Sequence, residues 1–350
     1  MRPSNKWPKW LITFCLPEFW NYIVIYTPVF SYILFKAVFR TKFKFYPFAL
    51  NRAIDESGGF AGANKNIIHN HFNPKLFPKT IHIAQNELSS ALKKITSEFN
   101  YPLILKPSNL NRGVAVQKIE DEEALLAYIN HAHFDIQAEE YLTQKMEVAV
   151  FIANSPNEPL KILSLTGKIF LTVTGNGKNT IKELLEQNWR YKMSESQIIP
   201  FWKNRWNRVP NEGETILIQP IGNHNKGTEF TNETHRITAA MEKYFDSIVP
   251  KELQFGRFDI KINDWSNLET GENLNIIEFN GNVAEPVSYL DTRYGYFKIQ
   301  RILFKHYFFQ YKIACEMIAL GVVAPSLWEG FKSLRNAGKF KKSLKSVRIP

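Results

Sequence analysis

Two segments in the last third of the chain place polar residues on one face of a predicted hairpin. Residues 255 to 263 and 274 to 280 are predicted strands. Polar and apolar side chains alternate from Arg257 to Ile262, as they do when one face is buried, and Glu278 and Asn280 likewise share a face. The polar residues on this face are Arg257, Asp259, Lys261, Glu278 and Asn280. If the strands pair, Asp259, Glu278 and Asn280 converge and offer two carboxylates and an amide oxygen. Such oxygen ligands suit Mg²⁺ held between a protein and nucleotide phosphates, and His and Cys do not cluster as zinc would require. The alternative is a solvated face with ordinary surface charges.

A lysine near the middle of the chain closes a predicted apolar strand. Lys106 ends the run from residue 101 and is followed by Pro107 and a polar loop that contains Gly113. The ammonium group and the loop amides could surround phosphate oxygens. The alternative is a lysine at the solvated end of a strand.

Three carboxylates flank an aromatic and an aliphatic residue shortly after this loop. Glu139 and Glu140 precede Tyr141 and Leu142, and Glu147 follows them. A carboxylate here could accept hydrogen bonds from ribose hydroxyls. Taken alone, the pattern is equally typical of a charged turn.

The elements that must position these residues alternate between strands and helices. Besides the segments above, residues 114 to 119 and 147 to 153 predict strands, and a helix is expected from Asp121 to about Asn130. Thr180 and Glu183 have the spacing of a capping box at the start of another helix. The alternation predicts an α+β fold, and no Rossmann or P-loop glycine fingerprint occurs.

Taken in order, these segments resemble the ATP-grasp superfamily, in particular its carboxylate-amine ligases. The resemblance covers about residues 60 to 290 and includes VTGNGKNTIKELL, which is close to a segment of cyanophycin and glutathione synthetases. It implies phosphate contacts from Lys106 and Gly113, and from Lys65 as a second phosphate ligand. It implies an adenine hinge and a ribose carboxylate among Glu139, Glu140, Leu142 and Glu147. It implies a catalytic Arg257 and metal ligands Asp259, Glu278 and Asn280.

The resemblance implies a fold and a reaction. The fold has two α+β subdomains that grip ATP, and the cofactor is Mg²⁺ or Mn²⁺. The reaction joins a small-molecule acid to an amine, or to a thiol, through an acyl phosphate, with Lys106 and Arg257 stabilising the transferred group. The expected regions are an aromatic, basic segment (1–60), a preceding region (61–100), the ATP-grasp domain (101–290) and a helical C-terminal region with a basic tail (291–350). The alternatives are a non-catalytic nucleotide-binding protein at the membrane surface and an ATP-dependent small-molecule kinase.

The net charge of +11 over 350 residues is located at the two ends of the chain. Residues 1 to 52 carry eight Lys and Arg against Glu18 alone, and residues 331 to 350 carry seven and no acid, which leaves −3 for the middle. This distribution argues against a nucleic-acid partner. Two cysteines far apart favour a reducing cytoplasm, and the oligomeric state stays open.

Eleven aromatic residues lie between Trp7 and Phe39. Residues 19 to 35 include no charged side chain, but the run is short for a bilayer span and is expected to be broken by Pro28. No secretory signal pattern is evident. Three interpretations remain open: core or lid, a surface helix on an anionic membrane beside Lys36, Arg40, Lys42 and Lys44, and a spanning helix.

Overall fold

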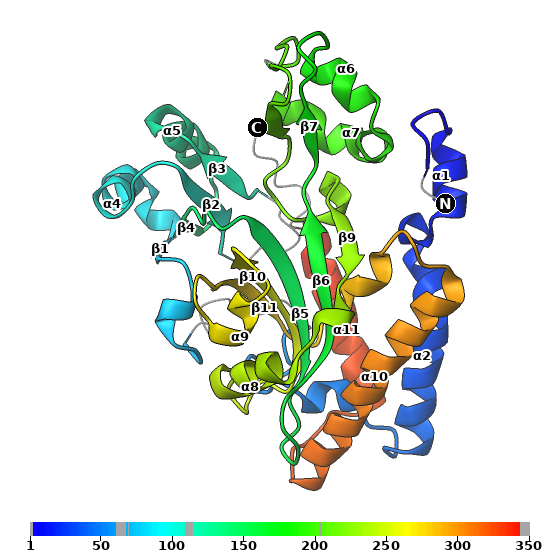
Figure 1. Cartoon of the computed structure of the whole chain (residues 1–350). Helices are drawn as coiled ribbons and strands as arrows, with labels where there is room; N and C mark the ends of the chain where they lie inside the picture. Colours follow the sequence, from blue (N-terminus) through cyan, green and yellow to red (C-terminus); the bar gives the residue numbers. More distant parts are fainter. Residues whose placement is uncertain (1–2, 61–67, 69, 109–114, 203–204, 344–350) are drawn as a thin grey trace.

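The computed structural model describes residues 3–60, 68, 70–108, 115–202 and 205–343. Lys65 and Gly113, both expected to contact phosphate, lie outside these residues. The α+β class predicted from the sequence is confirmed, because helices flank two larger antiparallel sheets and a small third one (Figure 1). Two sheets with helices agree with the two α+β subdomains that the resemblance implies.

The first sheet has four antiparallel strands in the order β1-β4-β2-β3. They are β1 (Thr80–Ile83), β2 (Leu103–Pro107), β3 (Gln117–Ile119) and β4 (Ile136–Glu140). Helices α4 (Ala91–Glu98) and α5 (Glu122–His131) cover it through a core that includes Ile95, Leu103 and Leu125. The helix expected after Asp121 is confirmed, and the Asp121 carboxylate accepts a hydrogen bond from the Ala124 amide.

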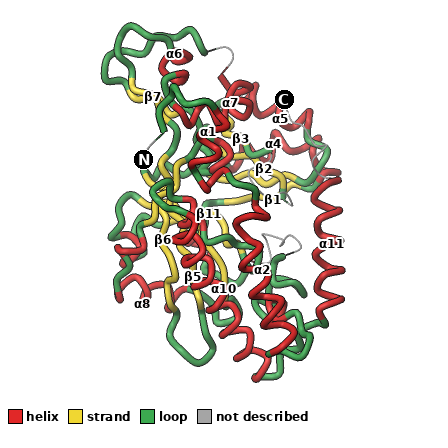
Figure 2. The backbone as a smooth tube through the Cα atoms, turned by 90° about the vertical axis from the view of Figure 1, so that its right-hand side faces the viewer, coloured by secondary structure: helices red, strands yellow, loops and turns green. Residues whose placement is uncertain are grey.

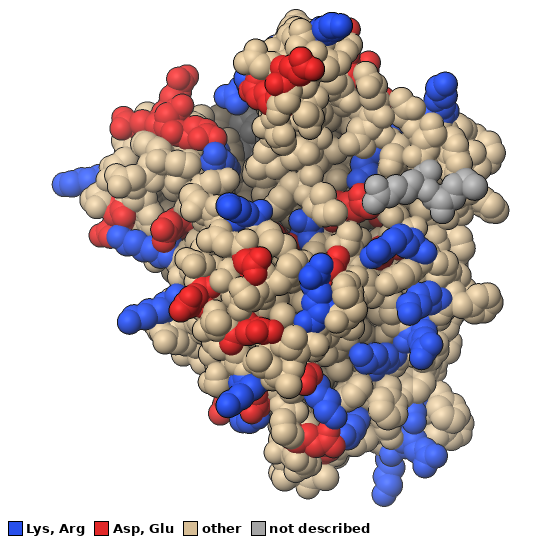
Figure 3. All heavy atoms as spheres, viewed as in Figure 1, with Lys and Arg blue, Asp and Glu red and all other residues tan. Residues whose placement is uncertain are grey.

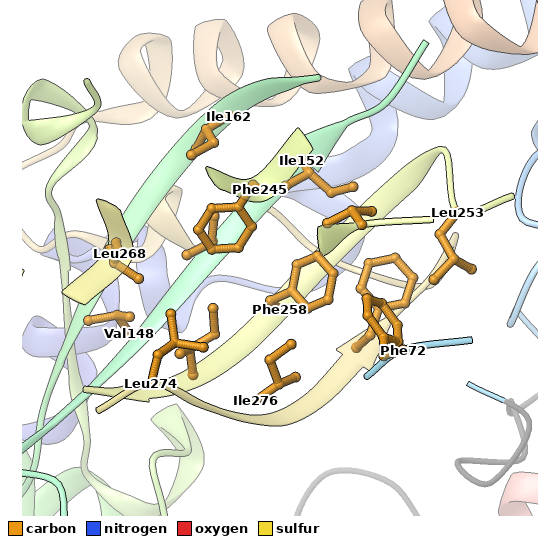
Figure 4. Packing of buried hydrophobic residues seen from close by; sticks show 14 of the residues in the cluster. Phe72, Val148, Ile152, Ile162, Phe245, Leu253, Phe258, Leu268, Leu274 and Ile276 are labelled. Carbon is orange, nitrogen blue, oxygen red and sulfur yellow. The ribbon is translucent and has the colours of Figure 1, made fainter. Parts of the chain in front are cut away.

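The second sheet has five antiparallel strands in the order β11-β10-β5-β6-β9. They are β5 (Met146–Ala153), β6 (Lys161–Ile169), β9 (Glu229–Asn232), β10 (Phe255–Ile262) and β11 (Asn275–Asn280). On one face, Ile152, Phe258 and Ile276 form the largest core with Phe245 of α8 (Ala239–Ile248) and Leu268 of α9 (Asn267–Thr270) (Figure 4). The predicted pairing of β10 with β11 is confirmed, so the polar residues of β10 face away from this core.

The third sheet pairs β7 (Thr172–Thr174) with β8 (Thr215–Leu217) beside α6 (Ile181–Glu186) and α7 (Trp189–Trp202). The predicted capping box is present, because Thr180 Oγ1 accepts from the Glu183 amide and a Glu183 carboxylate oxygen accepts from the Thr180 amide. The short 3₁₀ turns are η1 (Pro17–Phe19), η2 (Tyr46–Ala49), η3 (Pro74–Leu76), η4 (Gln85–Ser90), η5 (His224–Lys226), η6 (Thr234–Arg236) and η7 (Val287–Leu290).

Helices from the two ends of the chain complete the fold. They are α1 (Lys9–Cys15), α2 (Tyr22–Phe39), α10 (Tyr296–Ala319) and α11 (Leu327–Ser343). Of these, α2 and α10 pack on the other face of the second sheet through a core that includes Phe151, Phe255 and Ile313. In Figures 1 and 2, α2 lies alongside α10. The expectation that Pro28 breaks the apolar run is wrong, since α2 continues through it. Packing of Ile25, Tyr26 and Val29 against the protein stabilises this helix despite the amide that proline lacks.

Candidate functional site

A buried network of charges connects β5, β6 and β10. The ammonium group of Lys168 lies 2.6 Å from Glu147 Oε1 and 3.1 Å from Asp259 Oδ1. The guanidinium of Arg257 donates two hydrogen bonds to Asp259, from Nε at 3.1 Å and from Nη2 at 3.0 Å. Glu147, Lys168 and Asp259 are all buried. Sequence reasoning missed Lys168, for which the available signal was a lysine one residue before the end of a mostly buried strand.

Opposite charges favour the ionised forms of Asp259 and Lys168 although both side chains are buried. Burial raises the pKa of Asp259, but the charges of Arg257 and Lys168 and their hydrogen bonds outweigh it and lower the pKa to about 2. Burial lowers the pKa of Lys168, but Asp259 and Glu147 outweigh it, so the pKa rises above its usual value. The result is a preorganised cluster of two carboxylates and two cations.

The two further residues of the predicted metal site lie beside this cluster. Register places Glu278 opposite Asp259 and Asn280 opposite Arg257, and Asn280 Nδ2 donates to Glu278 Oε1 at 2.9 Å. The register shifts directly after Asp259, an irregularity that re-aims side chains at a strand edge. The three predicted ligands are thus brought to one face of the hairpin.

The chemistry of this donor set fits a hard divalent cation. Asp259, Glu278 and Asn280 offer oxygen atoms only, which suits Mg²⁺ or Mn²⁺. Among the described residues no three His, Cys, Asp or Glu side chains group as a self-sufficient metal site. Proteins usually bind Mg²⁺ through one or two carboxylates together with the phosphates of a substrate. Phosphate oxygens would therefore complete the coordination that these two carboxylates and one amide begin.

Lys106 is buried in the first sheet and forms an ion pair with Glu139 across β2 and β4. Gln137 Nε2 donates to the same Glu139 carboxylate at 2.7 Å, and register places Gln137 between Lys106 and His82. Burial lowers the pKa of His82, more than the neighbouring Glu139 raises it. The solvated strand end considered for Lys106 is therefore wrong.

An open cavity of about 680 Å³ lies where the two sheets connect. The segment 141–145 joins β4 to β5 and lines this cavity together with Glu147, Lys168 and Lys261. Tyr141, Leu142, Phe170 and Trp265 contribute apolar and aromatic surface. Its size and mixed lining fit a small-molecule ligand.

The four residues predicted for the hinge and ribose take different positions. Leu142 and Glu147 line the cavity, Glu139 is paired with Lys106, and Glu140 is exposed at the end of β4.

A loop after β8 covers Glu147. A Cβ atom at Gly222 would collide with the Glu147 carboxylate, so glycine lets the loop backbone lie this close to the present position of that carboxylate. Farther along the loop, His224 Nε2 lies 2.6 Å from a carboxylate oxygen of Glu18. The same Glu18 accepts two hydrogen bonds from Arg190, both at 3.1 Å. This cluster ties the N-terminal segment to α7 and the loop.

Comparisons with known proteins show similarity in structure only. No family model matches the chain, and neither does any curated protein. A bifunctional glutathione synthetase from Pasteurella multocida is 14% identical, with 69% of this chain and 36% of that one covered at a TM-score of 0.35. The VanG D-Ala:D-Ser ligase from Enterococcus faecalis is 14% identical, with 72% and 62% covered at 0.41. The D-alanine–D-alanine ligase from Bacillus anthracis is 13% identical, with 74% and 70% covered at 0.40. The chain thus spans about a third of the first enzyme and less than two thirds of the second.

Proposed function

We propose that this protein is an ATP-dependent ligase that joins a small-molecule carboxylic acid to an amine, or to a thiol, through an acyl phosphate. The observation that carries the proposal is the buried face on which Lys168 and Arg257 meet Glu147 and Asp259, with Glu278 and Asn280 in register beside them. Apart from Lys168, which was not part of the resemblance, the order of these residues along the chain is that of the ATP-grasp ligases that the sequence resembles.

In the proposed reaction a carboxylate oxygen of the acid attacks the γ-phosphorus of ATP, the bond to the β-phosphate oxygen breaks, and ADP leaves. The amine nitrogen then attacks the acyl carbon, phosphate leaves, and the nitrogen loses a proton. The chain's own contribution is positioning and neutralisation of charge.

Each named residue has a defined task in this proposal. Lys106 and Lys168 bind phosphate oxygens, Glu147 accepts hydrogen bonds from the ribose, and Arg257 stabilises negative charge on the transferred group and on the later tetrahedral oxyanion. Asp259, Glu278 and Asn280 would hold Mg²⁺ or Mn²⁺, which neutralises phosphate charge when bound. The salt bridges keep the side chains at fixed positions before substrate arrives.

The test is release of ADP across a panel of carboxylic acids combined with amines, with products identified by mass spectrometry. The ligase requires both substrates, and hydroxylamine in place of the amine should trap a hydroxamate. A phosphorylated product without any amine would instead show a kinase. Tight ATP binding with no ADP release across the panel would show a nucleotide-binding protein.

A substitution at the metal site separates turnover from binding. Glu278→Gln keeps the shape and removes one charge that acts on the phosphoryl-transfer transition state, so turnover should fall about 100-fold, or about 2.7 kcal/mol. ATP affinity by calorimetry should change far less. Glu272→Gln is the matched control, because Glu272 is exposed in the loop of the same hairpin. Two results would contradict the proposed metal site. One is an equal loss of turnover in Glu278→Gln and Glu272→Gln, and the other is ATP binding that does not change when Mg²⁺ is chelated.

A further inference from the structure

The outward side of α2 is apolar although it faces solvent. Ile25, Tyr26 and Val29 are buried against the protein, whereas Ile23 and Phe30 on the other side are exposed. Further exposed apolar residues of this side are Val24, Leu34, Phe35 and Phe39. A surface helix normally presents polar residues outward, so a helix that is apolar all round indicates a second apolar environment.

Neighbouring elements carry further exposed aromatic residues. Trp10 and Phe14 of α1 are 69% and 73% exposed, and Phe297 at the start of α10 is 88% exposed. Phe43 follows α2 with a positive φ of 61° and is 61% exposed. An aromatic residue in the left-handed region is uncommon, and here the strained turn presents its ring to solvent. Figure 2 views the backbone from the right-hand side of Figure 1, where α1, α2 and α10 lie. We call these exposed residues of α1, α2, α10 and Phe43 the aromatic face.

Positive charge surrounds the aromatic face. The sequence has no Asp or Glu between Glu18 and Asp55, and α10 has one acid, Glu316. Exposed cations on these elements are Arg40, Lys42 and Lys44 after α2 and Lys298 and Arg301 on α10. In Figure 3 the right-hand edge, where Figure 1 shows α10 and α2, carries Lys and Arg with few acidic side chains.

We propose that the aromatic face lies on an anionic membrane surface, with the rings in the interface and the cations at the headgroups. Aromatic side chains beside Lys and Arg are the composition of interfacial helices, and anionic lipids complement the charge. A second copy of the chain fits less well, because a symmetric contact would bring the same cations together. The inference does not depend on the proposed ligase activity.

The packing of α2 favours a helix that lies on a bilayer over one that crosses it. It is 18 residues long and passes the length and hydropathy test for a span, yet only about 27 Å long, short of the roughly 30 Å hydrocarbon core. One side is fastened to α10, where Gln300 Nε2 donates to Ile25 O at 2.8 Å and Lys36 lies 4.5 Å from the centre of the Tyr311 ring. These contacts keep that side on the protein.

Co-sedimentation of the full chain with vesicles tests the proposal. Binding is expected with phosphatidylcholine vesicles that contain phosphatidylglycerol and not with phosphatidylcholine alone, and salt should weaken it. Lys42→Gln with Lys44→Gln should reduce the partition coefficient about 25-fold, or fivefold for each charge. Lys93→Gln with Lys178→Gln is the matched control, since both lysines are exposed on other elements.

A second pair of variants tests the apolar contribution. Phe30→Gln with Leu34→Gln should lower binding about 100-fold, or tenfold for each side chain removed from the interface. Leu126→Gln on the exposed side of α5 should leave binding unchanged. Thermal melts confirm that each variant is folded, and ATP affinity should be the same in all, which separates this result from failure of the proposed function.

Three results would overturn the proposal. One is equal binding to neutral and anionic vesicles, or none to either. Another is a dimer in sedimentation velocity that becomes a monomer in the Phe30→Gln, Leu34→Gln variant, together with no binding of the wild type to vesicles. That result would assign the aromatic face to a second copy of the chain. The third is retention in cell membranes after alkaline carbonate extraction, which would indicate a spanning helix.

Discussion

Replacing Lys168 by Met isolates the charge at the centre of the buried network. The substitution keeps an unbranched chain of similar length but removes the cation that lies between Glu147 and Asp259. Both carboxylates stay buried, and Arg257 alone then compensates Asp259. Loss of one partner from a buried ion pair typically costs about 3–5 kcal/mol, whereas an exposed pair contributes up to about 1 kcal/mol. We therefore expect the free energy of unfolding to fall by about 4 kcal/mol at neutral pH.

The stability difference between the wild type and Lys168→Met should depend on pH. The folded pKa of Asp259, about 2, is below its unfolded value of 3.8, so its stabilising contribution is complete above pH 3.8 and is lost as the pH falls through 2. In the variant one of the two cations that lower this pKa is gone, so less stability remains to be lost at low pH. The difference between wild type and variant should therefore narrow below pH 4.

Urea unfolding followed by tryptophan fluorescence measures both effects. Lys161→Met is the control on the same strand, because Lys161 forms an exposed pair with Glu158 at 3.4 Å and should cost less than about 1 kcal/mol. The double variant Lys168→Met, Glu147→Gln should recover part of the lost free energy of unfolding, since one of the two buried carboxylates that Lys168 neutralised is then uncharged. The reasoning is refuted if Lys168→Met costs no more than the control, or if the penalty is the same at every pH.

Three further predictions concern other parts of the molecule. Burial lowers the pKa of His306 to about 3, below the roughly 6.5 of the unfolded chain, so the free energy of unfolding should fall by up to about 1.4 kcal/mol per pH unit from pH 6.5 toward 3. Urea unfolding at several pH values should show a flatter profile for His306→Gln. Gly222→Ala should displace the Glu147 carboxylate and weaken ATP binding about tenfold by calorimetry, if the proposed nucleotide site is right. Thr180→Ala should lower stability by about 1 kcal/mol, measured by hydrogen exchange of α6, because the capping hydroxyl is lost.

Each of these predictions has an outcome that contradicts it, and the two at Gly222 and Thr180 also have a control variant. Unchanged slopes for wild type and His306→Gln would mean that the buried imidazole is not the group that resists protonation. Gly295→Ala, at a glycine with open space around it and without a positive φ, controls for the general cost of replacing glycine. Equal effects on ATP binding would show that the contact between Gly222 and Glu147 is not the cause. Thr180→Ser retains the hydroxyl and should keep most of the protection of α6, so equal exchange in both Thr180 variants would exclude the capping box as its source.

Periodicity along the chain was enough to predict the hairpin and its polar face. Alternation from Arg257 to Ile262, and the two-residue spacing of Glu278 and Asn280, indicated which side chains share a face, because neighbouring residues of a strand point to opposite faces. The register then brought Asp259 opposite Glu278, as the proximity of the two segments in sequence suggested. The capping box at Thr180 was likewise predictable, since its hydrogen bonds join residues three positions apart.

Tertiary structure alone decided which charges are buried together and which apolar side chains are left exposed. Lys168 meets Asp259, and Lys106 meets Glu139, only because separate strands pair in one register. The side of α2 that stays exposed is set by its packing on α10, and the same packing carries the helix through Pro28. Local preferences act over a few residues, whereas burial and ion pairing depend on contacts between elements distant in sequence. A single sequence therefore predicts the strands and their faces, and the folded chain determines the partners.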